Sequence, residues 1–425
     1  MAKIKTLKEL RKFILYLEDK YDLLDFEIDG VNPWQLMRVH IDYNLGEILG
    51  IMSSPDTKLG ILDKVINAIG LLKSYIFKNP FLSSKVDTVI FSNSRVKQVD
   101  NEYIDIYTHY FIDELSKSNK NFIEIEAPHK GKHLTKNKPY KYHMEFVWIN
   151  KKLFNIFIKI KNKKENEIEK IENEIEQNIG KYDLKNIFYK SVREYKIEYF
   201  LYKNIFKKLN PSKVYLVVSY GFGAMIKAAK DLGIETIEFQ HGNFSEYHYG
   251  YYFGEDKKEL DYFPDKFYVW NEYWKNHINF PIDDKNIVIK QFDYLESRKT
   301  KYKHIEKVKN RAVVLSQGVL ADRIAQKILD NWGYFKHFEL IYKLHPGEYE
   351  RYQKYTHLNK LIYMGAKVVT DVDLYELFSS CEFQIGVFST ALYEGVEFGC
   401  KTIMLNLEGA EEMDRFRKIY EVELI

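Results

Sequence analysis

The sequence is poor in cysteine: Cys381 and Cys400 are the only two among 425 residues. Both lie in apolar segments, and neither a disulfide framework nor a thiolate metal site can be built from them. They suit a reducing compartment, in which a buried thiol behaves as a small hydrophobic group. We therefore expect a cytoplasmic protein.

Long apolar runs and a strong charge of one sign are also missing. No run of 18 uncharged apolar residues occurs, and the first residues, MAKIKTLKEL, lack the apolar core of a signal peptide. Lys and Arg number 64 against 61 Asp and Glu, which gives a net charge of only +3. This balance argues against a nucleic-acid partner, which usually requires a basic excess.

Residues 58–82 come closest to a membrane segment. Their apolar residues recur at helical spacing, with lysines between them: Leu62, Val65, Ile66, Ile69, Leu72 and Ile76, with Lys58, Lys64, Lys73 and Lys78. Two interpretations stay open. The segment is either a helix packed on its own domain or a helix that lies in the membrane interface, where it would give the protein a peripheral membrane contact.

What the sequence does contain is alternation of strands and helices. The first 80 residues are mainly helical in pattern, and strands are predicted at 88–92, 121–126, 213–221, 234–242, 265–270 and 286–290. Residues 150–200 are an insertion, in which Ile168, Ile171, Ile175 and Ile179 form a narrow apolar stripe. This insertion is either a helical hairpin or a protrusion. Together these elements predict an N-terminal Rossmann-like domain over 1–295 with a helical extension.

A second series follows a polar, basic stretch at 296–310, which we expect to be a linker. Over 311–425 the pattern predicts five strands that alternate with helices, the last at 400–406. Such alternation is typical of a doubly wound parallel sheet. The predicted fold class is therefore α/β, with two Rossmann-like domains.

Sheets of this kind bind ligands at the carboxyl ends of their strands. In the second series these ends carry polar clusters that converge at one edge of the predicted sheet. We expect a nucleotide-sugar donor site there, formed by Ser316, Gln317, Gly318, Lys343, His345, Pro346, Ser389, Thr390 and Glu394. Hydroxyl groups and backbone N–H groups at a helix start suit a phosphate, and Glu394 suits ribose hydroxyls.

The acceptor side is predicted in the first domain. His241 ends a strand in the sequence Gln240-His241-Gly242-Asn243, where glycine permits a sharp turn. An imidazole in this position can act as a general base toward an acceptor hydroxyl. Further acceptor-side candidates follow the first strand: Arg95, Asp100, Glu102 and Asp105.

The ordered segments QHG at 240–242, KLHPGE at 343–348, FSTALYEG at 388–395 and GCKTI at 399–403 resemble bacterial capsular and lipopolysaccharide glycosyltransferases of GT-B architecture. That group includes sialyl- and Kdo-transferases and CDP-glycerol glycerophosphotransferases. The resemblance covers residues 213–410. It implies a cytidine-nucleotide donor, with His345 at the donor phosphate and Ser389 and Thr390 near phosphate or carboxylate.

The sequence thus predicts a glycosyltransferase that uses a CMP-linked donor and an oligosaccharide or lipid-linked acceptor. His241 and His345 are the catalytic candidates, the first as base and the second at the leaving phosphate. Alternatives are a CDP-alditol phosphotransferase or UDP-sugar transferase of the same architecture, a UDP-sugar epimerase, and a non-catalytic nucleotide-sugar-binding subunit.

No cofactor and no metal is expected. Asp371 and Asp373 have the spacing of an Asp-x-Asp metal motif, but they begin a predicted helix. We interpret them as an N-cap region rather than a metal site.

Overall fold

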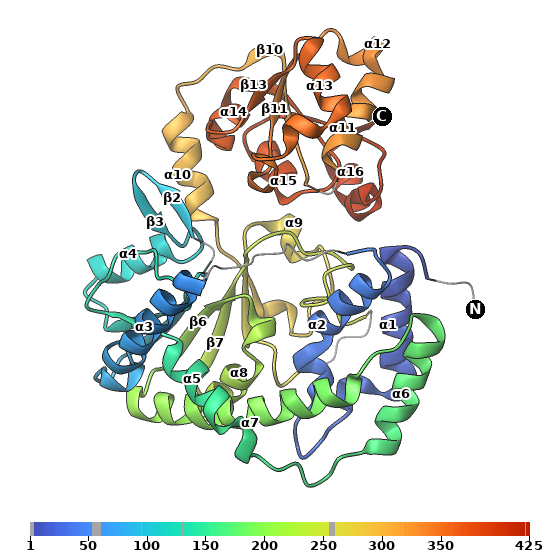
Figure 1. Cartoon of the computed structure of the whole chain (residues 1–425). Helices are drawn as coiled ribbons and strands as arrows, with labels where there is room; N and C mark the ends of the chain where they lie inside the picture. The colour runs from blue at the N-terminus through green and yellow to red at the C-terminus, as the bar shows by residue number, and fades with distance from the viewer. Residues whose placement is uncertain are drawn as a thin grey trace. The chain divides into compact units, whose positions relative to one another are not determined.

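The computed structural model describes residues 4–52, 61–94, 96–129, 131–254, 260–318, 320–420 and 422–425, and for 61–68 the backbone only (Figure 1). The chain divides into two compact units, Met1–Gln291 and Phe292–Ile425. Each unit has its own parallel sheet and its own core, so each is described by itself.

The first unit contains a seven-stranded sheet in the order β5-β4-β1-β6-β7-β8-β9, and all of its pairings are parallel. Its strands are β1 (Thr88–Ser92), β4 (Phe122–Glu126), β5 (Lys141–His143), β6 (Lys213–Val217), β7 (Glu235–Phe239), β8 (Lys266–Val269) and β9 (Ile287–Ile289). Counted along this sheet alone, the strands run 3-2-1-4-5-6-7. This is the Rossmann order, with its switch point between β1 and β6.

Helices cover both faces of this sheet. Helix α4 (His109–Lys117) packs on one face, where Ile112 meets Ile90 and Ile237. Helices α5 (Glu145–Phe154), α7 (Leu184–Leu209) and α8 (Gly223–Lys230) pack on the other. The β-branched and aromatic residues of the strands are thus buried on both sides, as a parallel sheet requires.

The helical extension has a core of its own. It consists of α1 (Leu7–Tyr21), α2 (Pro33–Ile48), α6 (Glu165–Asn178) and the first half of α7. Ile168, Ile171 and Ile175 of α6 are at most 1% exposed in this core. Residues 165–209 therefore form a helical hairpin, and the alternative of a protrusion is wrong, because the apolar stripe packs against α1 and α7.

Helix α3 (Ile61–Phe77) is shorter than the helix expected over 58–82, and a 3-10 turn at Pro80–Leu82 follows it. The first residues of the expected helix, 58–60, lie outside the described residues. Within the part of the chain that the structure describes, no helix is long and apolar enough to cross a membrane.

The second unit contains a six-stranded parallel sheet in the order β12-β11-β10-β13-β14-β15. Its strands are β10 (Val308–Leu315), β11 (Glu339–Lys343), β12 (Lys367–Val369), β13 (Cys381–Gly386), β14 (Lys401–Met404) and β15 (Glu423–Leu424). The order is again 3-2-1-4-5-6. The predicted α/β class, with two Rossmann-like units and a helical N-terminal extension, is confirmed.

Two expectations need correction, and some elements were not predicted. Residues 296–310 are no linker, because α10 (Asp293–Tyr302) and the start of β10 occupy them within the second unit. Buried Tyr294, Leu295 and Tyr302 give α10 an apolar side that its polar composition conceals. The strand at 400–406 is not the last, because β15 pairs with β14. In the first unit β5 was not predicted, and residues 97–104 form a hairpin of β2 (Lys97–Val99) and β3 (Glu102–Ile104).

Candidate functional site

The switch point of the second sheet lies between β10 and β13, and the predicted donor residues Gln317 and Ser389 follow these two strands. The Gln317 amide joins the two loops. Its Nε2 donates to the carbonyl of Phe388, and its Oε1 accepts from the Phe388 N–H at 3.2 Å. Ligands of such sheets bind in the crevice at this point. Gln317 thus shapes the loops that a donor nucleotide would meet.

A fully buried carboxylate, Glu348, holds the next pair of loops. Its Oε1 accepts from the Ser316 hydroxyl at 2.9 Å, and its Oε2 accepts from the backbone N–H of His345 at 2.8 Å. Glu348 was not predicted as a site residue, although its place in KLHPGE indicates a capping residue. It fixes the backbone from which the His345 side chain projects.

The His345 ring is exposed, and its Nδ1 accepts the backbone N–H of Gly347 at 3.2 Å. A neutral imidazole that accepts at Nδ1 carries its proton on Nε2. The hydrogen-bond pattern therefore presents His345 as an N–H donor at the carboxyl end of β11. Such a donor suits a phosphate oxygen.

Lys343 and Ser389 have local partners. Lys343 Nζ donates to the carbonyl of Thr370, and burial lowers the pKa of this amine. Ser389 is the N-cap of α15 (Thr390–Glu397), and its hydroxyl accepts from the Ala391 N–H at 3.2 Å. Thr390 starts the helix, and Gly318 accepts through its carbonyl from Arg351 at 3.2 Å.

Glu394 lies one turn into α15, beside the hydroxyl of Tyr375 on α14 (Leu374–Ser380). Burial and the neighbouring Glu394 carboxylate raise the pKa of Tyr375 well above its usual value. Asp373 caps α14 by accepting from the Tyr375 N–H at 3.0 Å, so the N-cap predicted at Asp371–Asp373 is confirmed for Asp373. Pro346 opens the 3-10 turn Pro346–Glu348 that follows His345.

In the first unit His241 belongs to a hydrogen-bonded relay. The hydroxyl of Tyr251 donates to Oε1 of Glu238 on β7, and the same hydroxyl lies 3.0 Å from Nδ1 of His241. Since the tyrosine proton goes to the carboxylate, the tyrosine oxygen accepts from Nδ1–H. His241 therefore carries its proton on Nδ1, and its basic nitrogen is Nε2.

Glu238 is fully buried within the sheet. Its Oε1 also accepts from the backbone N–H groups of Val218 and Ser219, each at 3.1 Å, at the end of the neighbouring strand β6. Burial raises the pKa of Glu238 to about 7, against the lowering effect of these hydrogen bonds. Glu238 was not predicted, although an acid in the strand segment IETIEF is a signal for a buried carboxylate with specific partners.

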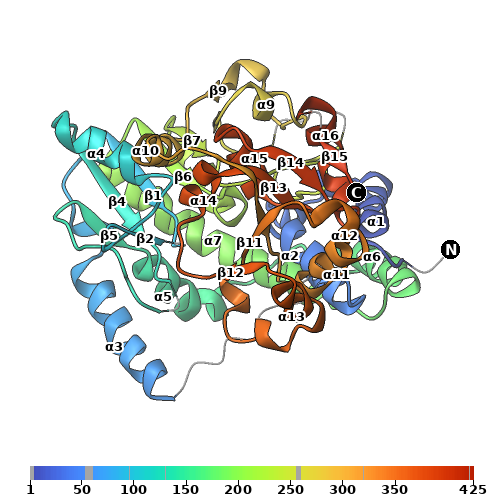
Figure 2. The same ribbon diagram turned by 90° about the horizontal axis from the view of Figure 1, so that it is seen from above.

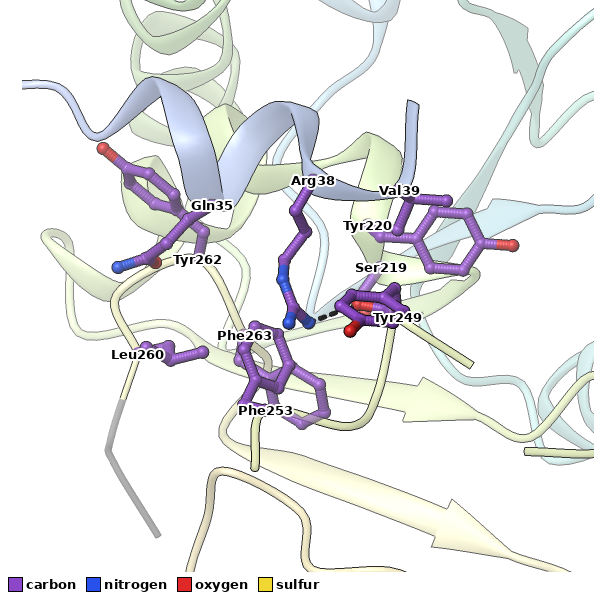
Figure 3. A pocket seen from close by; sticks show the side chains of 11 residues that line it. Gln35, Arg38, Val39, Ser219, Tyr220, Tyr249, Phe253, Leu260, Tyr262 and Phe263 are labelled. Carbon is purple, nitrogen blue, oxygen red and sulfur yellow. Dashed lines mark hydrogen bonds between the residues drawn. The ribbon is translucent and has the colours of Figure 1, made fainter. Parts of the chain in front are cut away.

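The helical extension positions the loop that carries Tyr251. Arg38 of α2 is 1% exposed, and its Nη1 donates to the carbonyls of Tyr249 and Tyr252, the latter at 2.8 Å. Its Nε and Nη2 bind Glu18 of α1, each at 3.0 Å. Figure 3 shows the guanidinium group reaching from α2 toward Tyr249 and Phe253 across a small pocket of about 20 Å³. The two carbonyls that Arg38 binds flank Tyr251 in the chain.

The turn after β7 is held by Gln240. Its Oε1 accepts from the Trp270 N–H and its Nε2 donates to the Gly242 carbonyl, both at 2.9 Å, and the side chain is 1% exposed. Gln240 thus fixes the turn that bears His241, and half-buried Asn243 follows in the same turn.

The predicted acceptor-side residues that follow β1 occupy different environments. Arg95 lies outside the described residues, and Asp100 is exposed, with a φ of 47°, in the tight turn between β2 and β3. Asp105 is buried and accepts from the N–H groups of Asn93 and Tyr107 and from the Thr108 hydroxyl at 2.6–3.0 Å. Burial raises the pKa of Asp105. Asp105 therefore orders the loop after β1.

A polar pocket of about 260 Å³ opens beside these residues. It brings Glu102 and Asp105 together with His109 at the start of α4 and with three lysines and a tyrosine from the β4–β5 segment: Lys136, Lys138, Lys141 and Tyr140. Thr108 also lines it, and the adjoining Tyr107 ring meets the His241 ring edge-on, with centroids 6.4 Å apart. The pocket and the relay thus lie close together in the first unit.

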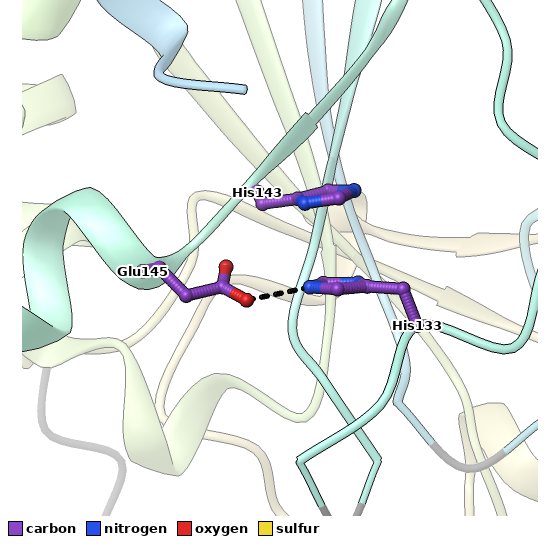
Figure 4. Close-up of side chains that lie close together, drawn as sticks. All are labelled: His133, His143 and Glu145. Carbon is purple, nitrogen blue, oxygen red and sulfur yellow. Dashed lines mark hydrogen bonds and ion pairs between the residues drawn. The ribbon is translucent and has the colours of Figure 1, made fainter. Parts of the chain in front are cut away.

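One group of described residues has the atoms for a metal ion: His133, His143 and Glu145 offer ligand atoms within 4.8 Å of one another. Both nitrogens of His133 already meet carboxylates, Glu126 at 2.8 Å and Glu145 at 2.6 Å. The two imidazole rings are stacked at 3.5 Å with an interplanar angle of 9° (Figure 4). Lone pairs in parallel planes do not converge on one ion, so we assign a hydrogen-bonded imidazolium here.

The comparisons with known proteins give no family. No family model and no curated protein matches the sequence. Similar solved structures include the UDP-GlcNAc 2-epimerase of Methanocaldococcus jannaschii, at 12% identity over 80% of this chain and 88% of that chain, with a TM-score of 0.45. A glycosyltransferase of Rickettsia africae has 13% identity over 81% and 84%, with a TM-score of 0.41.

MurG of Acinetobacter baumannii has 13% identity over 80% of this chain and 85% of that chain, with a TM-score of 0.42. Likenesses with TM-scores below 0.5 transfer neither a family nor an activity. The proposed function therefore rests on the side chains of the two candidate sites described above.

Proposed function

We propose that this protein is a glycosyltransferase that moves a sugar from a nucleotide-activated donor, a CMP-linked sugar, onto a surface polysaccharide or its lipid-linked precursor. The observation that carries the proposal is the hydrogen bond between Tyr251 and His241, at 3.0 Å. Sugar transfer requires that the acceptor hydroxyl lose its proton as it attacks. A histidine held with Nε2 as its basic nitrogen is suited to take that proton.

Glu238 and Tyr251 assist His241 in its proposed role as the base. When His241 accepts a proton at Nε2, the ring becomes a cation whose Nδ1–H faces the Tyr251 oxygen. The Tyr251 hydroxyl is already bonded to Glu238, so the ionised form of Glu238 places negative charge behind the ring as the positive charge forms. In a buried setting such preorganised groups stabilise charge strongly.

The polar pocket next to the relay is the proposed site for the acceptor saccharide. Its lining combines carboxylates, ammonium groups and a tyrosine, which suits a ligand rich in hydroxyl groups that also carries charge. Tyr107 contacts His241 and precedes Thr108, which lines the pocket. An acceptor sugar in the pocket would therefore reach His241 next to the Tyr107 ring.

The donor belongs to the second unit in this proposal. His345 offers Nε2–H at the end of β11. Gln317 joins the two loops at the β10–β13 switch point, and Ser389 caps helix α15 there. A leaving nucleotide phosphate gains stability from an N–H donor as the glycosidic bond breaks. The choice of a cytidine nucleotide rests on the resemblance of the KLHPGE and FSTALYEG segments.

A panel of CMP, CDP, UDP and GDP tests the donor, with the thermal midpoint as readout. CMP is expected to give the largest rise. Incubation with CMP-sugars and candidate acceptors, followed by mass spectrometry, then tests transfer.

Three results would contradict the proposal. The first is epimerisation of a UDP-sugar in the absence of any acceptor, which indicates an epimerase. The second is transfer of an alditol phosphate from a CDP donor, and the third is nucleotide binding without turnover, which indicates a binding subunit.

A further inference from the structure

Helix α3 exposes the face that an amphipathic helix normally buries. Ile69, Leu72, Ile76 and Phe77 are 56%, 56%, 51% and 70% exposed. The opposite side of the helix, with Ser74 and Tyr75, faces the protein. Large apolar side chains gathered at helical spacing on an outer face indicate a binding surface.

A second exposed apolar segment follows in the chain at the end of α5. Leu153 and Phe154 close this helix, and Ile156 and Phe157 lie in the 3-10 turn Asn155–Phe157. Their exposed fractions are 57%, 49%, 81% and 69%.

The two segments belong to neighbouring elements of the first unit. Tyr75 of α3 stacks on Phe146 of α5 with centroids 5.4 Å apart, and Asn150 of α5 donates to the Tyr75 hydroxyl at 3.4 Å. Figures 1 and 2 both show α3 beside α5. The contacts between α3 and α5 do not cover the eight apolar side chains of the two segments, which remain exposed.

The stretches of sequence that carry these side chains are rich in lysine. Residues 64–86 contain four lysines and residues 146–164 contain six, and neither stretch contains an Asp or a Glu. The whole chain, in contrast, has 64 basic and 61 acidic residues. Exposed Lys73, Lys152 and Lys159 stand next to the apolar positions.

We propose that α3 and the end of α5 form a docking surface for an anionic phospholipid bilayer. Apolar side chains would enter the boundary between headgroups and acyl chains, while the lysines would meet the phosphates. A second copy of the chain is a poorer occupant, because it would bring the same lysines face to face. The inference does not depend on the proposed sugar transfer.

Flotation of the full-length protein tests the surface. The vesicles contain phosphatidylglycerol with phosphatidylcholine in one arm and phosphatidylcholine alone in the other. We expect binding to the anionic vesicles, weaker binding to the neutral ones, and loss of binding as salt rises. Ile76→Glu and Phe157→Glu are each expected to lower partitioning by roughly tenfold or more, because an apolar contact is lost and a repelled charge is added.

Matched variants outside the surface serve as controls. Ile419→Glu changes a helical isoleucine of the second unit that is also 51% exposed, and Tyr363→Glu changes an aromatic residue that is 93% exposed. Both are expected to float like the wild type. Because all four positions are on the surface, circular dichroism should show four folded proteins.

Two results overturn the inference. The first is equal flotation of Ile76→Glu, Phe157→Glu and the controls. The second is no flotation of the wild type together with a dimer in sedimentation velocity that Ile76→Glu dissociates, which assigns the surface to self-association.

Discussion

The hydroxyl oxygen of Tyr251 lies 3.0 Å from Nδ1 of His241 and accepts its hydrogen bond, because the tyrosine's own proton goes to Glu238. One tyrosine thus determines which nitrogen of the histidine is basic. The three residues come from one strand and the loop behind it, and the helical extension holds that loop through Arg38.

Tyr251→Phe removes the oxygen that fixes the tautomer and leaves the ring in place. We expect kcat to fall by roughly ten- to a hundredfold, less than for loss of the base itself. The affinity for the nucleotide should stay unchanged, because this loop belongs to the acceptor side. Steady-state kinetics combined with calorimetry on CMP measures both quantities.

The matched control is Tyr189→Phe, another buried tyrosine of the first unit, whose hydroxyl donates to the Lys163 carbonyl at 2.8 Å. It should keep the wild-type kcat. Equal kcat losses in the two variants would show that Tyr251 acts only through stability.

His345→Ala removes the N–H donor assigned to the donor phosphate. A hydrogen bond to a charged group contributes about 1.5–3 kcal/mol, so CMP and CDP should bind roughly tenfold more weakly or worse. His337→Ala is the control, because His337 is exposed and precedes the opposite end of the same strand, β11. Unchanged calorimetric affinity in His345→Ala would remove His345 from the donor site.

Arg38→Ala leaves the buried Glu18 carboxylate without its charged partner, with the Trp34 indole N–H as its remaining hydrogen-bond donor. Breaking a buried ion pair in this way costs about 3–5 kcal/mol. Lys20→Ala breaks an exposed pair with Glu174 in the same extension and should leave the urea midpoint nearly unchanged, because solvent screens such a pair. Urea unfolding compares the two variants, and equal midpoints would contradict a role for Arg38 in clasping the loop.

His133 predicts a pH dependence of stability. Burial opposes its charged form, but the carboxylates of Glu126 and Glu145 outweigh burial and raise the pKa of His133 from 6.5 to about 9. The resulting stabilisation, about 3 kcal/mol, is fully present below pH 6.5 and is lost as the pH rises through 9. Urea unfolding of wild type and His133→Gln should therefore differ most at low pH, and a difference independent of pH would contradict the assignment.

Most of the fold could be predicted from local patterns. The strand at Thr88–Ser92 is a short apolar run with polar flanks, and Gly233 closes α8 with a φ of 72°. Helix α10 escaped prediction because its buried residues are two tyrosines, one arginine and a single leucine in an otherwise polar segment. Strand β15 has two residues, too few for a periodic signal.

The candidate site was only partly predictable. His241 and His345 stand out because each follows an apolar strand, which is a local signal. Tyr251 lies in a loop whose path depends on Arg38, more than 200 residues away in the sequence. A pairing of this kind arises from tertiary packing and leaves no periodicity in the sequence.

The most direct test of the proposed function is the turnover of His241→Ala with a CMP-sugar and its acceptor. General base catalysis typically contributes about 10²–10⁴-fold, so kcat should fall by that factor. The calorimetric affinity for CMP should stay within about twofold of the wild type, because the donor residues are intact. If His241→Ala keeps most of the wild-type kcat, His241 is not the base, and the account of the Glu238–Tyr251–His241 relay is wrong.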